Sequence, residues 1–177
     1  MKSDYIAARF FDNILAVLTL ENRLVMEVCL YTGLRVSDVL NMRSAKLARR
    51  MTVHELKTGK SRRITLPAEL YDRLVSVSGK IWVFTGRLDY HKHRTRQAVY
   101  KDIKRAAKAF RLPSNLQVSP HTARKIYAVS KYRKSGNMAY VQKLLNHSSE
   151  SITYLYAMAD ALTQRHYSGR YVDDSKV

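Results

Sequence analysis

The sequence is poor in the features that mark secreted and membrane-bound proteins. Cys29 is the only cysteine, so the chain cannot form an internal disulfide bond. No apolar run approaches the ~20 residues of a membrane-spanning helix, and the N-terminus lacks the charged, apolar and small-residue succession of a secretory signal. We therefore expect a cytoplasmic protein in which Cys29 is a small buried hydrophobic residue without a catalytic role.

Linkers and repeats are also missing from the sequence. It has no Pro- or Gly-rich stretch, no internal repeat and no low-complexity segment, and it contains only 3 prolines and 6 glycines. Hydrophobic residues make up 46% of the chain, which is enough to bury one core of ordinary size. The sequence therefore predicts a single domain over residues 1–177.

Acidic residues are scarce. The chain has 14 Asp and Glu against 32 Lys and Arg, which gives a formal net charge of +18. This excess exceeds what solubility requires and indicates a polyanionic partner, with nucleic acid as the first candidate. An anionic membrane surface is the alternative, but neither end of the chain offers a basic amphipathic helix or a lipidation signal.

The spacing of apolar residues predicts a mostly helical α+β domain. Residues 51–56 and 62–66 are predicted as two strands joined by a basic tip, and residues 81–84 as a third strand. Thr19 and Ser119 are predicted helix N-caps. Helices are expected at 4–18, 19–33, 34–42, 67–77, 95–110, 119–136 and 138–145. The predicted fold class is thus α+β, with a small three-stranded antiparallel sheet.

One face of the helix predicted at 95–110 is basic. Val99 and Ile103 recur on its apolar side, and the other side carries Lys101, Lys104, Arg105 and Lys108. Such a face is either simply solvated or in contact with phosphates. The overall charge of the chain raises the weight of the second interpretation.

His121 and Arg124 form the first pattern that can bind a phosphate. They lie three residues apart in the first turn of a predicted helix, so both project from one face. Free backbone N–H groups favour anions at this end of a helix. Alone the pair is weak evidence, because this spacing also occurs by chance.

Two further patterns involve helix ends. Gly33 suits a left-handed helix end and places Arg35 at the start of the next helix, where a surface salt bridge with Asp38 is its alternative role. The helix predicted at 138–145 ends at Asn146 and is followed by His147. Nine residues separate His147 from Tyr156.

In this order the three patterns resemble the tyrosine recombinase (phage integrase) family in its catalytic domain. That family has an Arg in a TGLR-like segment, a Lys on a β-hairpin, a His-x-x-Arg motif, a Leu-Gly-His segment and a Tyr nine residues later. The resemblance covers residues from about 20 to 157, and this sequence supplies Arg35, Lys57, His121, Arg124, His147 and Tyr156. Asn146 stands where the family usually has Gly, and Asn tolerates the left-handed conformation that the turn requires.

The resemblance implies roles for the cationic residues. Arg35 and Arg124 would bind the non-bridging oxygens of the scissile phosphate, since planar bidentate donors suit them better than a point charge. His147 would donate a further hydrogen bond to the phosphate. His121 would assist proton movement at the nucleophile, because the pKa of histidine lies near neutrality.

The resemblance also implies the covalent step. Tyr156 would attack the phosphorus and form a 3′-phosphotyrosyl intermediate, which conserves the ester energy and needs neither ATP nor a metal cofactor. Lys57 would protonate the leaving 5′ oxygen, with Lys60 as a less favoured substitute. Asp38 would orient Arg35 or His121, although capping of a helix accounts for it equally well.

The sequence disfavours a metal site at these histidines and another tyrosine as the nucleophile. A metal site is disfavoured because His121 and His147 lie 26 apart without Cys or a carboxylate at the usual ligand spacing. Other tyrosines compete with Tyr156 by residue type alone, and spacing decides against them: Tyr154, Tyr167 and Tyr171. Tyr154, two residues earlier, should point to a different face of a helix and pack in the core.

As partner the resemblance implies double-stranded DNA, bound as a homotetramer on synapsed DNA, with a monomer expected without DNA. The chain starts too near the catalytic core to contain the family's N-terminal core-binding domain, and residues 157–177 would reach a neighbouring protomer. The task would be DNA recombination or integration in a bacterial nucleoid, for a phage, a mobile element or the host cell. The basic residues expected on DNA are Lys60, Arg62, Lys101, Lys104, Arg105, Lys108 and Lys125.

Two other functions stay open at this point. Type IB topoisomerases resemble the family in their site and would nick and relax DNA; the short chain and the TGLR-like segment favour recombination. A basic DNA-binding module without catalysis is the alternative of another class. It would require the Arg, His and Tyr matches to be coincidental.

Overall fold

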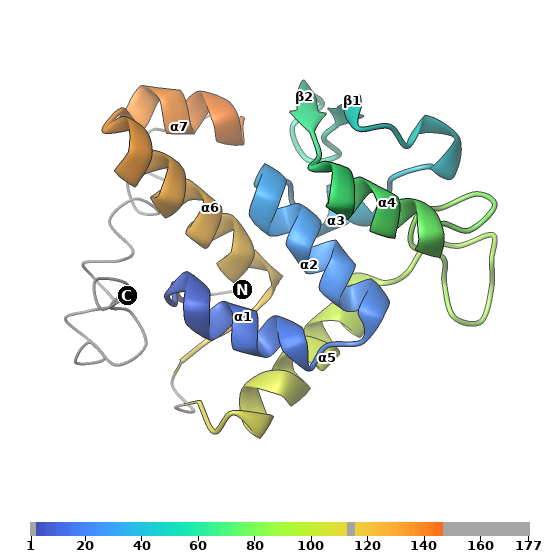
Figure 1. Ribbon diagram of the computed structural model, residues 1–177, viewed down its shortest axis with the longest axis horizontal. Helices are drawn as coiled ribbons and strands as arrows, with labels where there is room; N and C mark the ends of the chain where they lie inside the picture. The colour runs from blue at the N-terminus through green and yellow to red at the C-terminus, as the bar shows by residue number, and fades with distance from the viewer. Residues whose placement is uncertain (1–2, 113–115, 147–177) are drawn as a thin grey trace.

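The computed structural model describes residues 3–112 and 116–146, and every structural statement below concerns these residues. Their elements are, in chain order, α1 (Ala8–Ala16), α2 (Leu20–Thr32), α3 (Val36–Leu40), the 3-10 turn η1 (Ser44–Lys46), β1 (Arg50–His54), β2 (Ser61–Thr65), α4 (Ala68–Val77), α5 (Arg96–Ala109), α6 (Pro120–Ser135) and α7 (Met138–Leu145). In Figure 1 the hairpin and α7 lie at the top and α5 at the bottom. The predicted mostly helical class is confirmed.

Helix α2 is the centre of the fold. It packs against α1, α3, α4, α5 and α6, and Figure 1 shows it between them. Leu24, Met26 and Cys29 on α2 are fully buried, and each buried side chain of Leu or Met size contributes about 1.5–3 kcal/mol to folding. Burial raises the pKa of the Cys29 thiol to about 12, so the thiol stays protonated, in agreement with the role expected from the sequence.

Within residues 3–112 and 116–146, no helix is both long enough and apolar enough to cross a bilayer.

The end of α2 depends on Gly33. This residue has φ 67° and caps the helix in the left-handed conformation, which glycine adopts without steric cost. A Cβ atom at this position would collide with the ring of Tyr127 on α6. Gly33 is therefore required both by its backbone conformation and by the close approach of α6.

Helix α6 starts at the predicted cap. The Ser119 hydroxyl accepts a hydrogen bond from the backbone N–H of His121 at 3.2 Å, and Pro120 occupies the first helical position. Gly136 ends the helix in the left-handed conformation, with φ 61°. These caps fix the first turn of α6, which carries His121 and Arg124.

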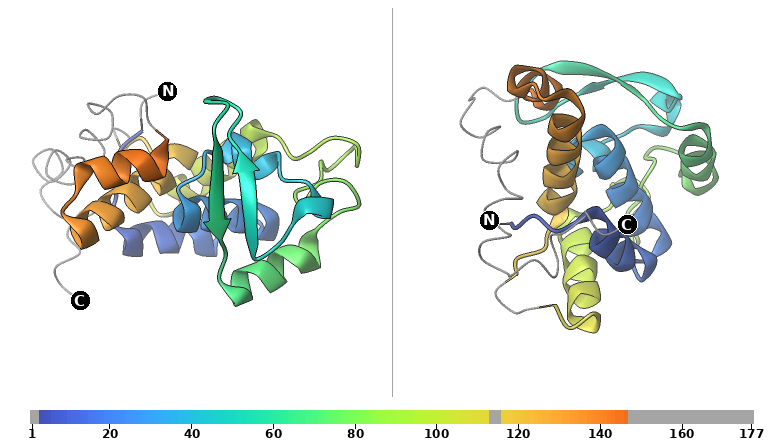
Figure 2. Two further views of the ribbon diagram at one scale, coloured as in Figure 1. Left: turned by 90° about the horizontal axis from the view of Figure 1, so that it is seen from above. Right: turned by 60° about the vertical axis from the view of Figure 1, so that its left-hand side comes forward.

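Strands β1 and β2 form an antiparallel hairpin whose register runs from Arg50 opposite Thr65 to His54 opposite Ser61. Val53 and Ile64 are the buried residues of the two strands. Figure 2 shows the hairpin as two long arrows in its left panel and along the top of the molecule, next to α7, in its right panel. The connecting residues 55–60 lie at the tip of this hairpin.

The prediction of a third strand at 81–84 is wrong: in the part of the chain that the structure describes, the sheet has two strands. Residues 81–83 instead bond to residues 42–44, where η1 begins, with Ser44 N–H donating to Ile81 O at 3.1 Å and Val83 N–H to Met42 O at 3.0 Å. Only one bridge, between Arg43 and Trp82, results. Because η1 begins at Ser44, the pairing cannot extend into a ladder.

Candidate active site

Arg35 stands at the start of α3, immediately after the left-handed end of α2. Its backbone N–H donates to Asp38 Oδ2 at 3.3 Å. Asp38 is buried, and its Oδ1 accepts from the backbone N–H of Leu56 at 2.9 Å. Asp38 therefore caps α3 and ties it to the base of the hairpin tip, which is the second of the two roles expected for it.

The Arg35 side chain is held by Glu55. Nη1 of Arg35 donates to Glu55 Oε2 at 2.5 Å, and the two side chains are 15% and 0% exposed. The carboxylate fixes one corner of a guanidinium that carries five N–H donors. Arg35 is thus partly accessible and oriented before any ligand binds.

Arg124 is the most deeply buried cation of the site. It is 1% exposed and donates from Nη1 to the carbonyl oxygen of Gly33 and from Nη2 to that of Leu145 at 2.6 Å. These two carbonyls belong to the C-terminal ends of α2 and α7. Gly33, to which Arg124 is bonded, lies two residues before Arg35. The fold therefore brings Arg124 to the α2–α3 turn that carries Arg35, although the two arginines are far apart in the sequence.

His121 lies one helical turn before Arg124 on α6. Desolvation by the surrounding protein, and then the positive charges of Arg124, Arg35, Lys125 and Lys57, lower the pKa of His121 from 6.5 to about 4. The residue nevertheless keeps exposed surface, so solvent still reaches it. Its imidazole is therefore neutral at pH 7, whereas the sequence suggested a pKa near neutrality.

Lys57 lies in the hairpin tip and is exposed, as is Lys60 three residues later. The tip is closed by two backbone bonds, from Gly59 N–H to Glu55 O and from Glu55 N–H to Lys60 O, both at 2.9 Å. Gly59 has φ 65° and provides the turn. Lys57 is thus carried on a short, hydrogen-bonded loop next to Glu55.

Asn146 ends α7 in the left-handed conformation, with φ 49° and ψ 36°, as predicted. Its side-chain amide donates to Glu55 Oε1 at 2.8 Å. The residue before His147 therefore lies against the same carboxylate as Arg35. His147, Tyr156 and the competing tyrosines fall outside the described residues, and their roles stay predictions.

Arg62 of β2, expected on DNA, makes contacts inside the protein. It donates to the carbonyl oxygen of Thr32 at 2.9 Å and to that of Leu144, and its Nε lies 3.6 Å from Glu55 Oε1. Burial lowers its pKa, and the charge of Glu55 opposes this shift. The guanidinium is committed to internal contacts, and a DNA contact of Arg62 stays untested.

The remaining basic residues expected on DNA differ in their contacts. Lys101 and Lys108 on α5 are exposed. Lys104 donates to Gln117 at 3.1 Å, Arg105 pairs with Asp102 at 2.6 Å, and Lys125 donates to the Ser3 carbonyl. Because α5 lies at the end of the molecule opposite the hairpin in Figure 1 and in the right panel of Figure 2, this basic face is separate from the site around Glu55.

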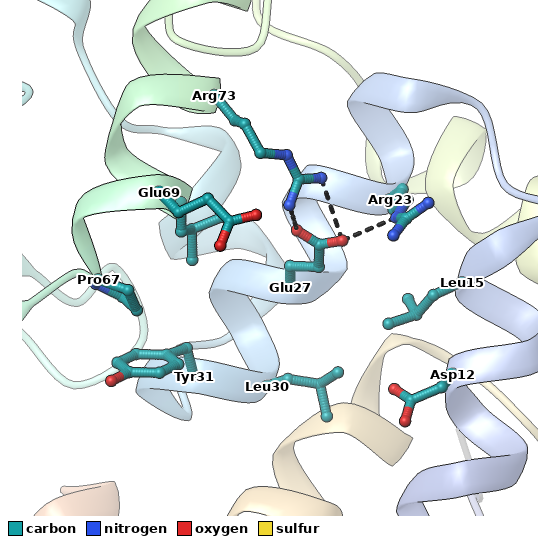
Figure 3. A pocket seen from close by; sticks show the side chains of 10 residues that line it. Asp12, Leu15, Arg23, Glu27, Leu30, Tyr31, Pro67, Glu69 and Arg73 are labelled. Atoms are coloured by element: carbon teal, nitrogen blue, oxygen red, sulfur yellow. Dashed lines mark hydrogen bonds and ion pairs between the residues drawn. The ribbon is translucent and has the colours of Figure 1, made fainter.

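A cavity of about 440 Å³ lies between α1, α2 and α4 and contains none of the predicted catalytic residues. Figure 3 shows Glu27 at its centre, paired with Arg23 at 2.8 Å and Arg73 at 2.7 Å. Asp12 lines the same cavity, and desolvation together with the charge of Glu27 raises its pKa. The Glu27–Arg73 ion pair thus joins α2 to α4 in this cavity. We assign no catalysis to it.

Comparison with known protein families shows the family to which the chain belongs. The model of the Phage integrase family matches residues 7–162. The chain belongs to the phage integrase family.

Three known proteins illustrate how this phage integrase family member compares with others. It is 28% identical over 145 residues to a tyrosine recombinase of Thermosipho africanus (strain TCF52B), covering 77% of this chain and 49% of that protein. It is 29% identical over 140 residues to the probable integrase/recombinase YoeC of Bacillus subtilis (strain 168), covering 76% and 75%. A lambda integrase dimer bound to a COC' core site matches with TM-score 0.75 and 21% identity, covering 100% of this chain and 52% of that one.

These matches confirm the predicted fold as that of a phage integrase catalytic domain. The chain spans about half the length of the Thermosipho recombinase and of the lambda integrase chain.

Sequence reasoning missed one charged residue of this phage integrase site entirely. Glu55 is fully buried, yet it was not among the candidates. A carboxylate two residues before Lys57, in a basic hairpin of a chain with few acids, was the available signal. Its partner Arg35 lies 20 positions away, however, and no local spacing joins the two.

Proposed function

We propose that this chain is the catalytic domain of a site-specific DNA recombinase that cleaves and rejoins strands through a 3′-phosphotyrosyl intermediate on Tyr156. One observation carries the proposal: the fold brings Arg35, Arg124 and His121 to one place, beside the hairpin tip with Lys57 and the turn that precedes His147. These groups come from four separate segments of the chain. Their proximity in the fold supports the family resemblance, which depends on the order of motifs along the sequence.

The chemistry follows from charge. A phosphodiester resists attack because its anionic oxygens repel nucleophiles, and negative charge grows further in the transition state. Guanidinium groups of Arg35 and Arg124 would neutralise the non-bridging oxygens. His147 would add a donor.

The covalent step exchanges one ester for another. The Tyr156 oxygen, after loss of its proton with help from the neutral His121, would bond to phosphorus while the bond to the 5′ oxygen breaks. Lys57 would deliver a proton to that leaving oxygen. Attack of a 5′ hydroxyl on the phosphotyrosine reverses these transfers and rejoins the strand, so neither ATP nor a metal is consumed.

As partner we propose double-stranded DNA. The net charge of +18 supports it, and the lambda integrase to which the chain is similar was solved as a dimer bound to its core site. A homotetramer on synapsed DNA, with residues 157–177 exchanged between protomers, and a monomer without DNA belong to the same proposal. So does a cytoplasmic setting in which the protein serves a phage, a mobile element or the host.

A nicked suicide duplex made from the DNA that flanks the gene tests the proposal. In this substrate cleavage releases a short strand and traps the covalent complex. We expect an SDS-stable adduct that is lost in Tyr156→Phe and retained in the matched variant Tyr154→Phe. Retention in Tyr156→Phe, or no adduct with any flanking sequence, contradicts the proposal. Strand joining between two duplexes then distinguishes recombination from relaxation by a topoisomerase.

A further inference from the structure

The carboxylate of Glu55 is the point at which the separate parts of the site meet. It is fully buried, and each of its oxygens has two partners. Oε2 accepts from Arg35 at 2.5 Å and from the Thr58 hydroxyl at 3.3 Å. Oε1 accepts from Asn146 at 2.8 Å and lies 3.6 Å from Nε of Arg62.

These partners lie on elements that carry proposed catalytic groups. Arg35 is itself one of them, and Thr58 follows Lys57 in the hairpin tip. Asn146 immediately precedes His147 at the end of α7. Arg62 belongs to β2 and connects the carboxylate to the ends of α2 and α7. One buried anion therefore links the α2–α3 turn, the hairpin and the α7 turn.

We propose that Glu55 is a positioning residue for phosphodiester cleavage, acting by holding the guanidinium of Arg35 and the turn at Asn146 in the geometry that the reaction needs. The proposal rests on the proposed function of the chain. Glu55 itself does not touch DNA, because its side chain has no exposed surface. It acts through Arg35 on the phosphate and through Asn146 on the turn that ends α7.

The charge balance explains why a carboxylate stands here. Arg35 and Arg62 bring two positive charges to a buried site, and an unpaired buried charge is strongly unfavourable. Glu55 compensates them with a single negative charge. The site thus keeps a net positive charge, which suits a phosphate ligand, while Arg35 is held in one orientation.

Asn146 gives the arrangement a feature particular to this chain. Where the resembled family usually has Gly, this residue adopts the left-handed conformation and uses its amide to bind Glu55. Glycine could form the turn but not the bond. Asn146→Gly therefore removes the link to the α7 turn while leaving the backbone conformation favourable.

The test compares Glu55→Gln, Asn146→Gly and the control Glu21→Gln, an exposed carboxylate on α2. Gln offers only one acceptor oxygen, so it cannot satisfy both Arg35 and Asn146. We expect the rate of adduct formation on the nicked duplex to fall roughly 10–100-fold in Glu55→Gln and less in Asn146→Gly, since misplacement of ~1 Å can cost about 100-fold. DNA affinity, measured by gel shift in a Tyr156→Phe background, should change less than about threefold, because a positioning residue affects the rate of the reaction more than the binding of the substrate.

A double-mutant cycle separates positioning from a general structural effect. If Glu55 acts through Arg35, Glu55→Gln should cause a smaller rate loss in the Arg35→Ala background than in the wild type, because residues that act as a unit are not additive. Additive losses, or a wild-type rate in folded Glu55→Gln and Asn146→Gly, overturn the proposal. Should Glu55→Gln not fold, the rate of Asn146→Gly decides alone. Failure of the wild-type protein to form any adduct would instead overturn the proposed function.

Discussion

Arg62 and Arg124 donate hydrogen bonds to consecutive carbonyl oxygens at the ends of the same two helices. Arg62 binds Thr32 and Leu144, and Arg124 binds Gly33 and Leu145. The last carbonyls of a helix lack intrahelical partners and carry partial negative charge, so guanidinium groups satisfy them well. Two arginines from α6 and β2 thereby fasten the end of α2 to the end of α7.

This arrangement predicts that Arg62 stabilises the fold. Arg62→Ala would remove the Arg62 donors from two helix-end carbonyls and one of the two positive charges beside the buried Glu55, so we expect the free energy of unfolding to fall by about 2–4 kcal/mol. The neighbouring Arg63 is exposed, and Arg63→Ala should stay within about 0.5 kcal/mol of the wild type. Urea denaturation measures both. Unchanged stability of Arg62→Ala with weakened DNA binding would favour the DNA contact expected from the sequence.

Gly33 and Gly136 offer a matched pair for the close approach of α2 and α6. Both have positive φ, but a Cβ at Gly33 meets the Tyr127 ring, whereas nothing lies within 4 Å of one at Gly136. Gly136→Ala should cost about 1 kcal/mol through backbone strain, and Gly33→Ala about 2–3 kcal/mol through strain and overpacking together. Thermal denaturation gives the difference. In a Tyr127→Ala background, the cost of Gly33→Ala should be smaller than in the wild type. Equal costs of Gly33→Ala and Gly136→Ala in the wild type would contradict the contact with Tyr127.

The sequence predicts much of this fold because its signals are local. Ser119 and Gly33 mark helix ends by a capping side chain or the lack of a side chain, and both predictions are confirmed. Thr19 stands at the predicted N-cap position, but its hydroxyl donates to Asp102 and does not cap the helix. The prediction of a third strand was wrong because the pairing of Trp82 is decided by tertiary packing and not by its neighbours in the sequence. Arg62 likewise gave no signal, since its carbonyl partners lie 30 and 82 positions away.

The lowered pKa of His121 makes a prediction about pH. Because its folded pKa of about 4 lies below the ordinary value of 6.5, the unfolded chain binds more protons between these pH values. Stability relative to His121→Gln should therefore be highest above pH 6.5 and decrease as the pH falls toward 4. NMR titration of the imidazole should give a pKa below 6.5 that rises in Arg35→Ala, which removes one of the cations. A pKa at or above 6.5 in the wild type would contradict the electrostatic picture.

Lys57 and Lys60 allow the proposed general acid to be tested within one loop. Both are exposed and lie three residues apart in the hairpin tip. Lys57 adjoins Thr58, whose hydroxyl binds the Glu55 carboxylate, and the backbone carbonyl of Lys60 accepts from the Glu55 N–H. Loss of a general acid typically slows a reaction by about 10²–10⁴-fold. Lys57→Ala should show such a loss of adduct formation on an ordinary duplex. Lys60→Ala should remain within about tenfold of the wild type, since the proton donor is intact.

A substrate in which sulfur replaces the 5′ bridging oxygen identifies the step that fails. A thiol has a pKa of about 8.5 and leaves without protonation, unlike an alkoxide. This substrate should restore Lys57→Ala to near the wild-type rate, because the missing proton is no longer needed. It should not restore Arg35→Ala, whose defect lies in charge neutralisation at the non-bridging oxygens. Rescue of Lys60→Ala instead of Lys57→Ala would move the general acid three residues along the loop.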